Sequence, residues 1–493
     1  MSNFKNYVNG EWTESASGET FENVNPADSR DIIGTFPKSG NADVAKAIEA
    51  ASTAYKVWSA MPAPKRGDIL RVAGDIFNRR KDELARVMTR EMGKPVFETK
   101  GDIQEAIDTA YYSATETRRL FGYTAPSEMP NKMNLSFRMP IGVCGIITAW
   151  NFPIAVPSWK ILPALACGNT IVWKPSEDSP MSANIFAEIL EEAGVPKGVF
   201  NVIHGLGETG SAIVEHPDVK LIGFTGSTVT GKKIAERCGA LNKKVSLEMG
   251  GKNAVIIMND ADIDLAIEGV LWGAFGTTGQ RCTATSRAIV HKDVYDIFLQ
   301  KLTEKTIALK LGAGLEDSTQ VGPVINKKQY EKILGYIEIG KEQGARLVTG
   351  GAKAEGADVE HGNFIQPTVF ADVTNDMRIF KEEIFGPVLS VSKANSYSHA
   401  IELANDCEYG LSSSIYTSDV NLAFSAIRSI EAGITYINAP TIGAEAHMPF
   451  GGIKGTGNGH REGGWTVFDI FTEWKTVYID YSGGLQRAQI DNY

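Results

Sequence analysis

The sequence predicts an α/β protein built on parallel β-sheets. Segments with the spacing of amphipathic helices alternate with short apolar segments along most of the 493 residues, which favours mixed layers over separate all-helical and all-strand parts. From Ile141 onward the apolar segments recur roughly every 25 residues, as parallel strands joined by right-handed crossover helices do. With 43% apolar and 22% charged residues, a chain of this length is expected to fold into roughly two to four domains.

The region before these repeats is predicted to be helical and to end in a hairpin. Asp43–Trp58 and Lys65–Met92 are predicted as amphipathic helices, with charged side chains on one face and aliphatic ones on the other. Gly101–Leu120 is predicted as a third helix. Gly122–Met139 is rich in proline and asparagine and ends in alternating residues, so we expect a protruding hairpin. Glu473–Tyr481 also alternates, and it is expected to pair with this hairpin or with another subunit.

Two series of alternating strands and helices follow the hairpin. The first is predicted at Gly142–Ala149, Val156–Cys167, Thr170–Lys174, Ser182–Ala193, Phe200–His204, Ser211–His216, Leu221–Phe224 and Val229–Cys238. The second is predicted at Ala254–Ile257, Asp262–Phe275, Ser286–His291 and Val294–Leu311, with further elements to about Tyr436. Each series predicts a parallel sheet covered by helices.

Composition excludes several classes of function. The formal net charge of −10 argues against a protein that follows nucleic-acid phosphates or a basic membrane-surface anchor. The start of the chain lacks a basic segment followed by an apolar core, and no apolar run reaches bilayer length, so we expect neither a secretory signal nor a membrane span. Five scattered cysteines without a CxxC pair predict a reduced, cytoplasmic protein. The seven histidines are not at metal-ligand spacing, so no catalytic metal is expected.

The turn after the first strand of the first series has the position of a dinucleotide site. It runs from Thr148 to Pro153, and a proline that starts a helix leaves the following backbone amides free to face an anion. The second strand ends at Lys174 and is followed by Glu177. An acid at this position binds ribose hydroxyls and disfavours a 2′-phosphate. The alternative is that Lys174 and Glu177 form a solvated strand end.

Two later turns are rich in glycine. His204–Gly210 contains a GxGxxG pattern that includes Gly207, and Phe224–Thr228 places Gly226 and Ser227 between a strand and a helix. Either turn alone is as compatible with a tight connection as with a ligand. Two such turns on one sheet favour an anion-binding edge.

Cys282 is the candidate nucleophile. It lies among glycines and hydroxyls directly after Arg281, and a cationic neighbour lowers the pKa of a thiol. A buried, inert thiol is the alternative. The other four cysteines have apolar neighbours and are expected to be structural: Cys144, Cys167, Cys238 and Cys407.

Glu248 is the candidate general base. It is predicted to end a strand just before a glycine pair, where apolar surroundings would raise the pKa of its carboxyl toward neutrality. The alternative is an ordinary exposed acid.

Together these segments resemble the aldehyde dehydrogenase superfamily, and the similarity extends over nearly the whole chain. Seven motifs in the order of that family carry the resemblance: Trp150–Pro153, Lys174–Glu177, Phe224–Ser227, Glu248–Lys252, Phe275–Cys282, Glu383–Pro387 and Pro449–Gly452.

The resemblance implies a role for each matching residue. Cys282 would attack the aldehyde, Asn151 and the Cys282 backbone N–H would hold the resulting oxyanion, and Glu248 would activate the water that hydrolyses a thioester. The implied cofactor is NAD, with NADP left open as a second one. The implied cofactor contacts are Thr148, Trp150, Lys174, Glu177, Gly207, Gly226, Ser227, Glu383 and Phe385.

The family fold implies two doubly wound, Rossmann-like domains and a small β oligomerisation element, in a homodimer or homotetramer. The implied divisions are a cofactor domain at 1–122 and 141–248, a catalytic domain at 249–447, an oligomerisation element at 123–140 and 473–493, and a return to the cofactor domain at 448–472.

The substrate is less constrained by the resemblance. The sequence around Cys282 and after Gly455 is closest to branches that oxidise carboxylate-bearing semialdehydes, such as α-aminoadipic or α-ketoglutaric semialdehyde. Arg281 could pair with that carboxylate in the aldehyde tunnel, beside Trp159 and Phe450, or it could pair with a structural acid. A bulky apolar aldehyde that makes no contact with Arg281 is the alternative substrate.

Two alternative hypotheses for the function remain. An acylating relative would transfer the acyl group to coenzyme A, but Glu248 counts against it. A noncatalytic NAD-binding scaffold could retain the same fold.

Overall fold

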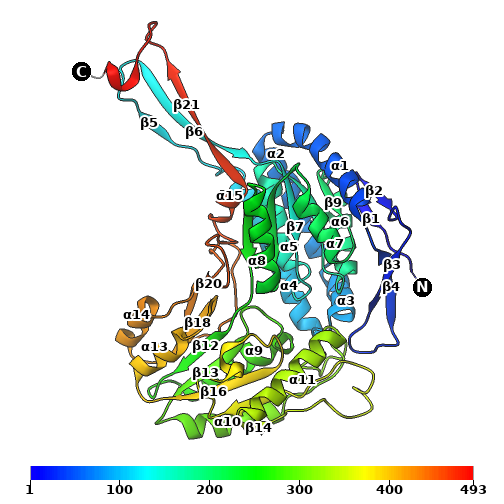
Figure 1. The fold of residues 1–493 in the computed structure, drawn as a ribbon, viewed down its shortest axis with the longest axis vertical. Helices are drawn as coiled ribbons and strands as arrows, with labels where there is room; N and C mark the ends of the chain where they lie inside the picture. Colours follow the sequence, from blue (N-terminus) through cyan, green and yellow to red (C-terminus); the bar gives the residue numbers. More distant parts are fainter. Residues whose placement is uncertain (1, 492–493) are drawn as a thin grey trace.

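The computed structural model describes residues 2–491 and consists of two helix-flanked β-sheets and a slender arm (Figure 1). The arm projects away from the first sheet, and the C-terminal segment lies at its far end. The mixed α/β class and the parallel sheets are as predicted. Within the described residues, no helix has the length and apolar character needed to cross a membrane.

The first sheet has the strand order β11-β10-β7-β8-β9-β1-β2, and the strands from β11 to β9 run parallel. One hydrophobic core joins α2–α6 to one face, and a second joins α1, α7 and α8 to the other. The strands are β1 (Asn6–Val8), β2 (Glu11–Thr13), β7 (Val143–Ile147), β8 (Thr170–Lys174), β9 (Phe200–Val202), β10 (Val219–Thr225) and β11 (Lys244–Glu248). The helices are α1 (Asn41–Ala60), α2 (Ala63–Arg79), α3 (Lys81–Met92), α4 (Val96–Glu116), α5 (Ala155–Cys167), α6 (Pro180–Glu192), α7 (Gly207–Glu215) and α8 (Thr228–Ala240).

The second sheet has the order β14-β15-β16-β13-β12-β18-β19 and is parallel except for β14. Helices α9 and α10 pack on one face, and α11–α14 pack on the other. The strands are β12 (Asn253–Ile257), β13 (Thr285–His291), β14 (Arg346–Thr349), β15 (Thr368–Ala371), β16 (Val388–Ala394), β18 (Ser412–Tyr416) and β19 (Ile434–Ile437). The helices are α9 (Ile263–Phe275), α10 (Tyr295–Ile307), α11 (Lys327–Glu342), α12 (Arg378–Lys381), α13 (Tyr397–Asn405) and α14 (Val420–Ser429).

The arm is a three-stranded antiparallel sheet of β5 (Thr124–Pro126), β6 (Lys132–Pro140) and β21 (Thr472–Asp480). Strand β21 pairs with β6 along its whole length, so the predicted pairing of the C-terminal strand with the early hairpin is confirmed. The last two residues of the predicted element, Asn492 and Tyr493, lie outside the described part. The remaining short elements are β3 (Thr20–Val24), β4 (Ile32–Pro37), β17 (Tyr409–Gly410), β20 (Ile453–Lys454), α15 (Val467–Ile470) and the 3₁₀ turns Gly276–Gly279 and Ala488–Ile490.

The structure corrects the prediction in the N-terminal region. The single helix predicted at Lys65–Met92 is two helices, α2 and α3, which break at Arg80. The amphipathic pattern continues across this break, so periodicity alone does not reveal it. Helix α4 begins at Val96 rather than at Gly101, with Pro95 as its N-cap residue, whose carbonyl accepts hydrogen bonds from the Glu98 and Thr99 amides. Strands β1–β4 were not predicted; each is short and lies outside the alternating series.

Candidate active site

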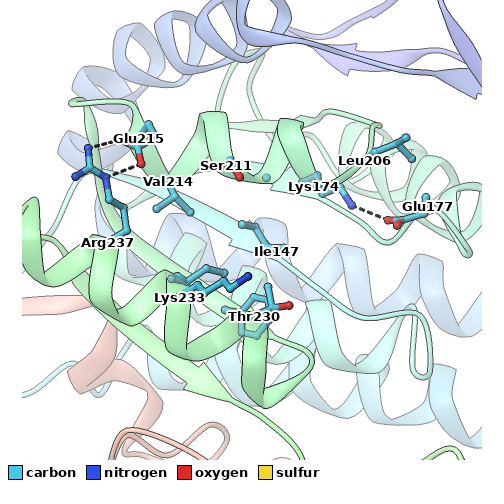
Figure 2. Close-up of a pocket in the computed structure, with 14 residues that line it drawn as sticks. Ile147, Lys174, Glu177, Leu206, Ser211, Val214, Glu215, Thr230, Lys233 and Arg237 are labelled. Carbon is cyan, nitrogen blue, oxygen red and sulfur yellow. Dashed lines mark hydrogen bonds and ion pairs between the residues drawn. The ribbon is translucent and has the colours of Figure 1, made fainter. Parts of the chain in front are cut away.

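The first part of the site is a cavity of about 290 Å³ at the carboxyl ends of β7 and β8 (Figure 2). Lys174 and Glu177 line one end, where Nζ lies 2.9 Å from Oε2, and Gly207 at the start of α7 lies on the wall. The far end is closed by Arg237, which donates two hydrogen bonds of 2.5 Å to Glu215. An apolar slot with charged groups at both ends fits the adenosine portion of a dinucleotide.

The second part is a cavity of about 170 Å³ between the two sheets. Gly226 and Ser227 line it at the N-terminus of α8, where the Ser227 hydroxyl accepts a hydrogen bond from the Thr230 amide. Helix N-termini favour anions, so this edge fits a pyrophosphate. Trp150 and Phe385 also line the cavity, with ring centroids 5.4 Å apart and nearly perpendicular planes.

Glu383 and Phe385 are held in the wall of this cavity by constrained backbone. The Glu383 carboxylate accepts a hydrogen bond of 2.9 Å from the Gly251 amide. A Cβ atom at Gly250 would lie 2.5 Å from the Glu383 carboxylate, so the glycine is needed for this approach. Phe385 has a φ of 61°, an unfavourable conformation for a bulky residue that is concentrated at functional sites.

Cys282 lines both this cavity and an adjoining smaller one of about 50 Å³. Burial, followed by the charges of Glu248 and Glu383, raises the pKa of its thiol to about 12. The predicted lowering of this pKa by Arg281 is therefore wrong. The guanidinium is directed to Glu98, with Nη2 2.9 Å from Oε2, so it does not stabilise a thiolate.

Arg281 pairs with a structural acid, which is the second of the two arrangements considered for it. Its guanidinium also lies over the Trp272 ring, with 4.8 Å between Cζ and the ring centroid. The residue still lines the smaller cavity, together with Trp159 and Phe450, whose ring centroids are 4.7 Å apart. A ligand in the smaller cavity would therefore contact Arg281 while its guanidinium is already paired with Glu98.

Glu105 also lines the smaller cavity, and the sequence reasoning did not identify it. Its carboxylate has no hydrogen bond or ion pair with any described residue. Burial, followed by the charge of Asp102, raises its pKa to about 8. The smaller cavity therefore contains an acidic group that has no hydrogen bond or ion pair and is stabilised only by the more distant charges of Arg281 and Lys94.

Glu248 ends β11 and is 4% exposed. Neither carboxylate oxygen has a hydrogen-bond partner among the described residues. Burial raises its pKa to about 8, against the opposing charges of Lys160 and Arg461. Lys160 forms a buried ion pair with Glu462, and this pair was not predicted. A buried carboxylate with a pKa near neutrality and free oxygens can accept a proton from a thiol or from water.

Asn151 and Thr148 follow β7 but are placed differently. Asn151 is buried and lines the cavity of about 170 Å³ together with Cys282. Its side-chain amide makes no hydrogen bond with the described residues, so it is available to an oxyanion. The Thr148 hydroxyl instead accepts a hydrogen bond of 2.9 Å from the Trp173 indole, and the residue lines none of the three cavities.

Comparison with known proteins gives a consistent result. The model of the aldehyde dehydrogenase family matches residues 12–477. The α-ketoglutaric semialdehyde dehydrogenase of Bacillus subtilis is 42% identical over 97% of this chain and 98% of its own length. The betaine aldehyde dehydrogenase of Sinorhizobium fredii is 41% identical over 96% of each chain.

Solved structures show the same similarity. A Staphylococcus aureus betaine aldehyde dehydrogenase in complex with NAD⁺ has a TM-score of 0.95 and 35% identity, and the match covers 98% of this chain and 95% of that one. An NADP-dependent enzyme of Escherichia coli has a TM-score of 0.94 and 39% identity over 97% and 98%. These matches, together with the cavities described above, argue against the hypothesis of a noncatalytic NAD-binding scaffold. The chain belongs to the aldehyde dehydrogenase family and is an NAD(P)-dependent enzyme that oxidises aldehydes.

Proposed function

We propose that Cys282, Asn151 and Glu248 carry the aldehyde oxidation. The observation that supports this most directly is the position of Cys282 between two cavities, one lined by the expected cofactor contacts and one lined by Trp159 and Phe450. A nucleophile at that junction can reach an aldehyde and a cofactor at once.

The first step forms a bond between the Cys282 sulfur and the aldehyde carbon, and the thiol releases its proton to solvent, which reaches the partly exposed Cys282. The carbonyl electron pair moves to oxygen, and the Asn151 amide and the Cys282 backbone N–H stabilise the resulting alkoxide, which is worth on the order of 3 kcal/mol per donor. When bound in the neighbouring cavity, NAD would supply the acceptor for the hydride that leaves this carbon. The alkoxide then returns its electron pair, and Cys282 carries a thioester.

The second step removes the acyl group. Glu248 accepts a proton from a water molecule as the water oxygen attacks the thioester carbon, and the carbon–sulfur bond breaks to give the carboxylic acid and the free thiolate. The position of Glu248, buried and without hydrogen bonds on the wall of the smaller cavity, supports this role. It also disfavours the acylating alternative, in which no base for water is needed.

Replacing Cys282 tests this assignment. Cys282→Ala should abolish NADH formation while the melting temperature and NAD affinity stay close to those of the wild type, because the alanine removes only the sulfur. Cys407→Ala is the matched control, since Cys407 is the other partly exposed cysteine and lines neither cavity. Steady NADH production by Cys282→Ala would overturn the proposal.

For the substrate we propose a semialdehyde whose far end carries both a carboxylate and an ammonium group. The Bacillus relative is named for a carboxylate-bearing aldehyde and the Sinorhizobium relative for a quaternary ammonium aldehyde. The smaller cavity combines Arg281, already paired, with the unpaired Glu105. An amino acid semialdehyde matches both groups better than a purely anionic or a purely apolar aldehyde.

The arm and the cysteines support two further assignments. Tyr123 and Tyr478 on the arm are 69% and 65% exposed, and exposed apolar strands of this kind favour association. We propose a homodimer or homotetramer formed through the arm, which a monomer in light scattering would contradict.

Five free cysteines, without a disulfide in the described part, favour the cytoplasm. The domain divisions given above remain a prediction.

A further inference from the structure

Helix α4 presents a stripe of carboxylates to the active site. Glu98, Asp102 and Glu105 are spaced four and three residues apart, so they lie on one face of the helix. Glu105 lines the smaller cavity, whereas Glu98 and Asp102 are buried, with exposed fractions of 6% and 1%. Buried carboxylates need compensating hydrogen bonds, and these two obtain them from the loops that carry Cys282 and Asn151.

Glu98 holds the loop before the nucleophile. Its Oε1 accepts a hydrogen bond of 3.0 Å from the Thr277 amide, and its Oε2 accepts one of 2.5 Å from the Thr277 hydroxyl and one of 2.9 Å from Arg281. Thr277 and Thr278 have φ angles of 52° and 56°. This left-handed conformation is unfavourable for β-branched residues and persists only when neighbouring contacts enforce it.

Asp102 holds the turn that carries Asn151. Helix α5 begins at Ala155 without a side-chain cap from its own N-cap residue. Asp102 supplies that cap from α4, because its Oδ1 accepts a hydrogen bond of 2.7 Å from the Ala155 amide. Its Oδ2 accepts one of 2.6 Å from Lys94, whose ammonium lies 3.9 Å from the centroid of the Phe152 ring. The Ala155 amide, one of those after Pro153 that were expected to face a cofactor anion, therefore donates to Asp102 instead.

We propose that Glu98 and Asp102 are positioning residues that set the separation between the Cys282 thiol and the Asn151 amide. This inference rests on the proposed roles of those two residues. Four residues of a rigid helix span about 6 Å, so α4 fixes one loop against the other. The oxyanion must meet its donor at hydrogen-bond distance, and a displacement of about 1 Å can lower the rate about 100-fold.

A purely structural role is the competing explanation, and the chain contains a matched control for it. Glu91 on α3 is also fully buried, and its carboxylate accepts hydrogen bonds from the Met181 and Ser182 amides in the first turn of α6. It thus caps a helix from outside, as Asp102 does, but it contacts neither active-site loop. Glu91→Gln measures the loss of such a cap alone.

The experiment measures the rate of the first turnover, observed as a burst of NADH in stopped flow, with melting temperature, NAD affinity and aldehyde KM as companions. Glu98→Gln weakens the contact between α4 and the loop before Cys282. Lys94→Met/Asp102→Asn weakens the contact between α4 and the turn that carries Asn151. The double change avoids leaving Lys94 as an unpaired buried cation, which by itself would be strongly destabilising. Glu91→Gln is the control.

We expect a burst rate about 10- to 100-fold below that of the wild type in both test variants, measured at saturating aldehyde, with NAD affinity within about twofold. Aldehyde KM should stay within about twofold in the double variant, whereas Glu98→Gln also removes the ion pair of Arg281 at the smaller cavity. Glu91→Gln should lower the melting temperature by a similar amount yet keep its burst rate within about twofold. Unchanged burst rates in the test variants, or an equal loss in Glu91→Gln, would overturn the inference. If the double variant does not fold, the burst rate of Glu98→Gln compared with that of Glu91→Gln tests the inference. If the wild type shows no burst, hydride transfer or an earlier step limits turnover, and steady-state kcat gives the same comparison; a wild type that forms no NADH from aldehydes would instead refute the proposed function.

Discussion

The pH dependence of turnover follows from the burial of Glu248. Only its deprotonated form can accept a proton from water, and burial raises its pKa to about 8. At pH 7 about one tenth of the enzyme would carry the active form, and at pH 9 about nine tenths. Turnover limited by hydrolysis of the thioester should therefore rise nearly tenfold from pH 7 to pH 9.

The assay compares steady-state turnover with the first-turnover burst across this range, at saturating aldehyde and cofactor. Glu248→Gln should still give a burst of about one NADH per active site and then stall, because the glutamine cannot accept the proton. The pH rise in steady turnover should be absent in this variant. A wild-type profile that is flat between pH 7 and pH 9, or rises only near pH 4 to 5, would refute the assignment of Glu248 as the base.

Two further predictions concern selectivity. Glu177→Ala should reduce the preference for NAD over NADP about tenfold or more, because Glu177 lines the cavity that fits adenosine and an acid there would disfavour a 2′-phosphate; an undiminished preference in kcat/KM would place the selectivity elsewhere. At pH 9, where Glu105 is mostly charged, Glu105→Gln should lower kcat/KM about tenfold for 2-amino-6-oxohexanoate but less than about twofold for 6-oxohexanoate and hexanal, since only the first carries an ammonium group. In the wild type the advantage of the amino substrate should grow as the pH rises through 8 and Glu105 becomes charged, and equal losses for all three aldehydes would argue against this contact.

Several features of the site could be predicted because they follow directly from chain order. Parallel strands bring their carboxyl ends to one edge, so the turns after β7, β8 and β10 were expected to lie together, and all three contribute to the cavities. The raised pKa of Glu248 was also expected, because apolar surroundings disfavour the charged form of an acid.

Other features depend on contacts between distant segments. The pKa of Cys282 was predicted in the wrong direction because Arg281 precedes it in sequence. In the structure the Arg281 guanidinium forms an ion pair with Glu98 instead of facing the thiol. The start of α4 was placed five residues late, which separated Glu98 from Glu105 and concealed the stripe of carboxylates. The pairing of Lys160 with Glu462 joins residues far apart in the chain, and local pattern carries no signal for it.

The central claim is that oxidation proceeds through an acyl group bound to Cys282, and mass spectrometry of the trapped enzyme tests it most directly. Glu248→Gln would be mixed with aldehyde and NAD for one turnover, quenched in acid and digested. The account predicts that the peptide containing Cys282 gains the mass of the acyl group, in an amount that matches the NADH released, while the peptide containing Cys407 is unchanged. NADH released in full without an acyl group on Cys282 would contradict it.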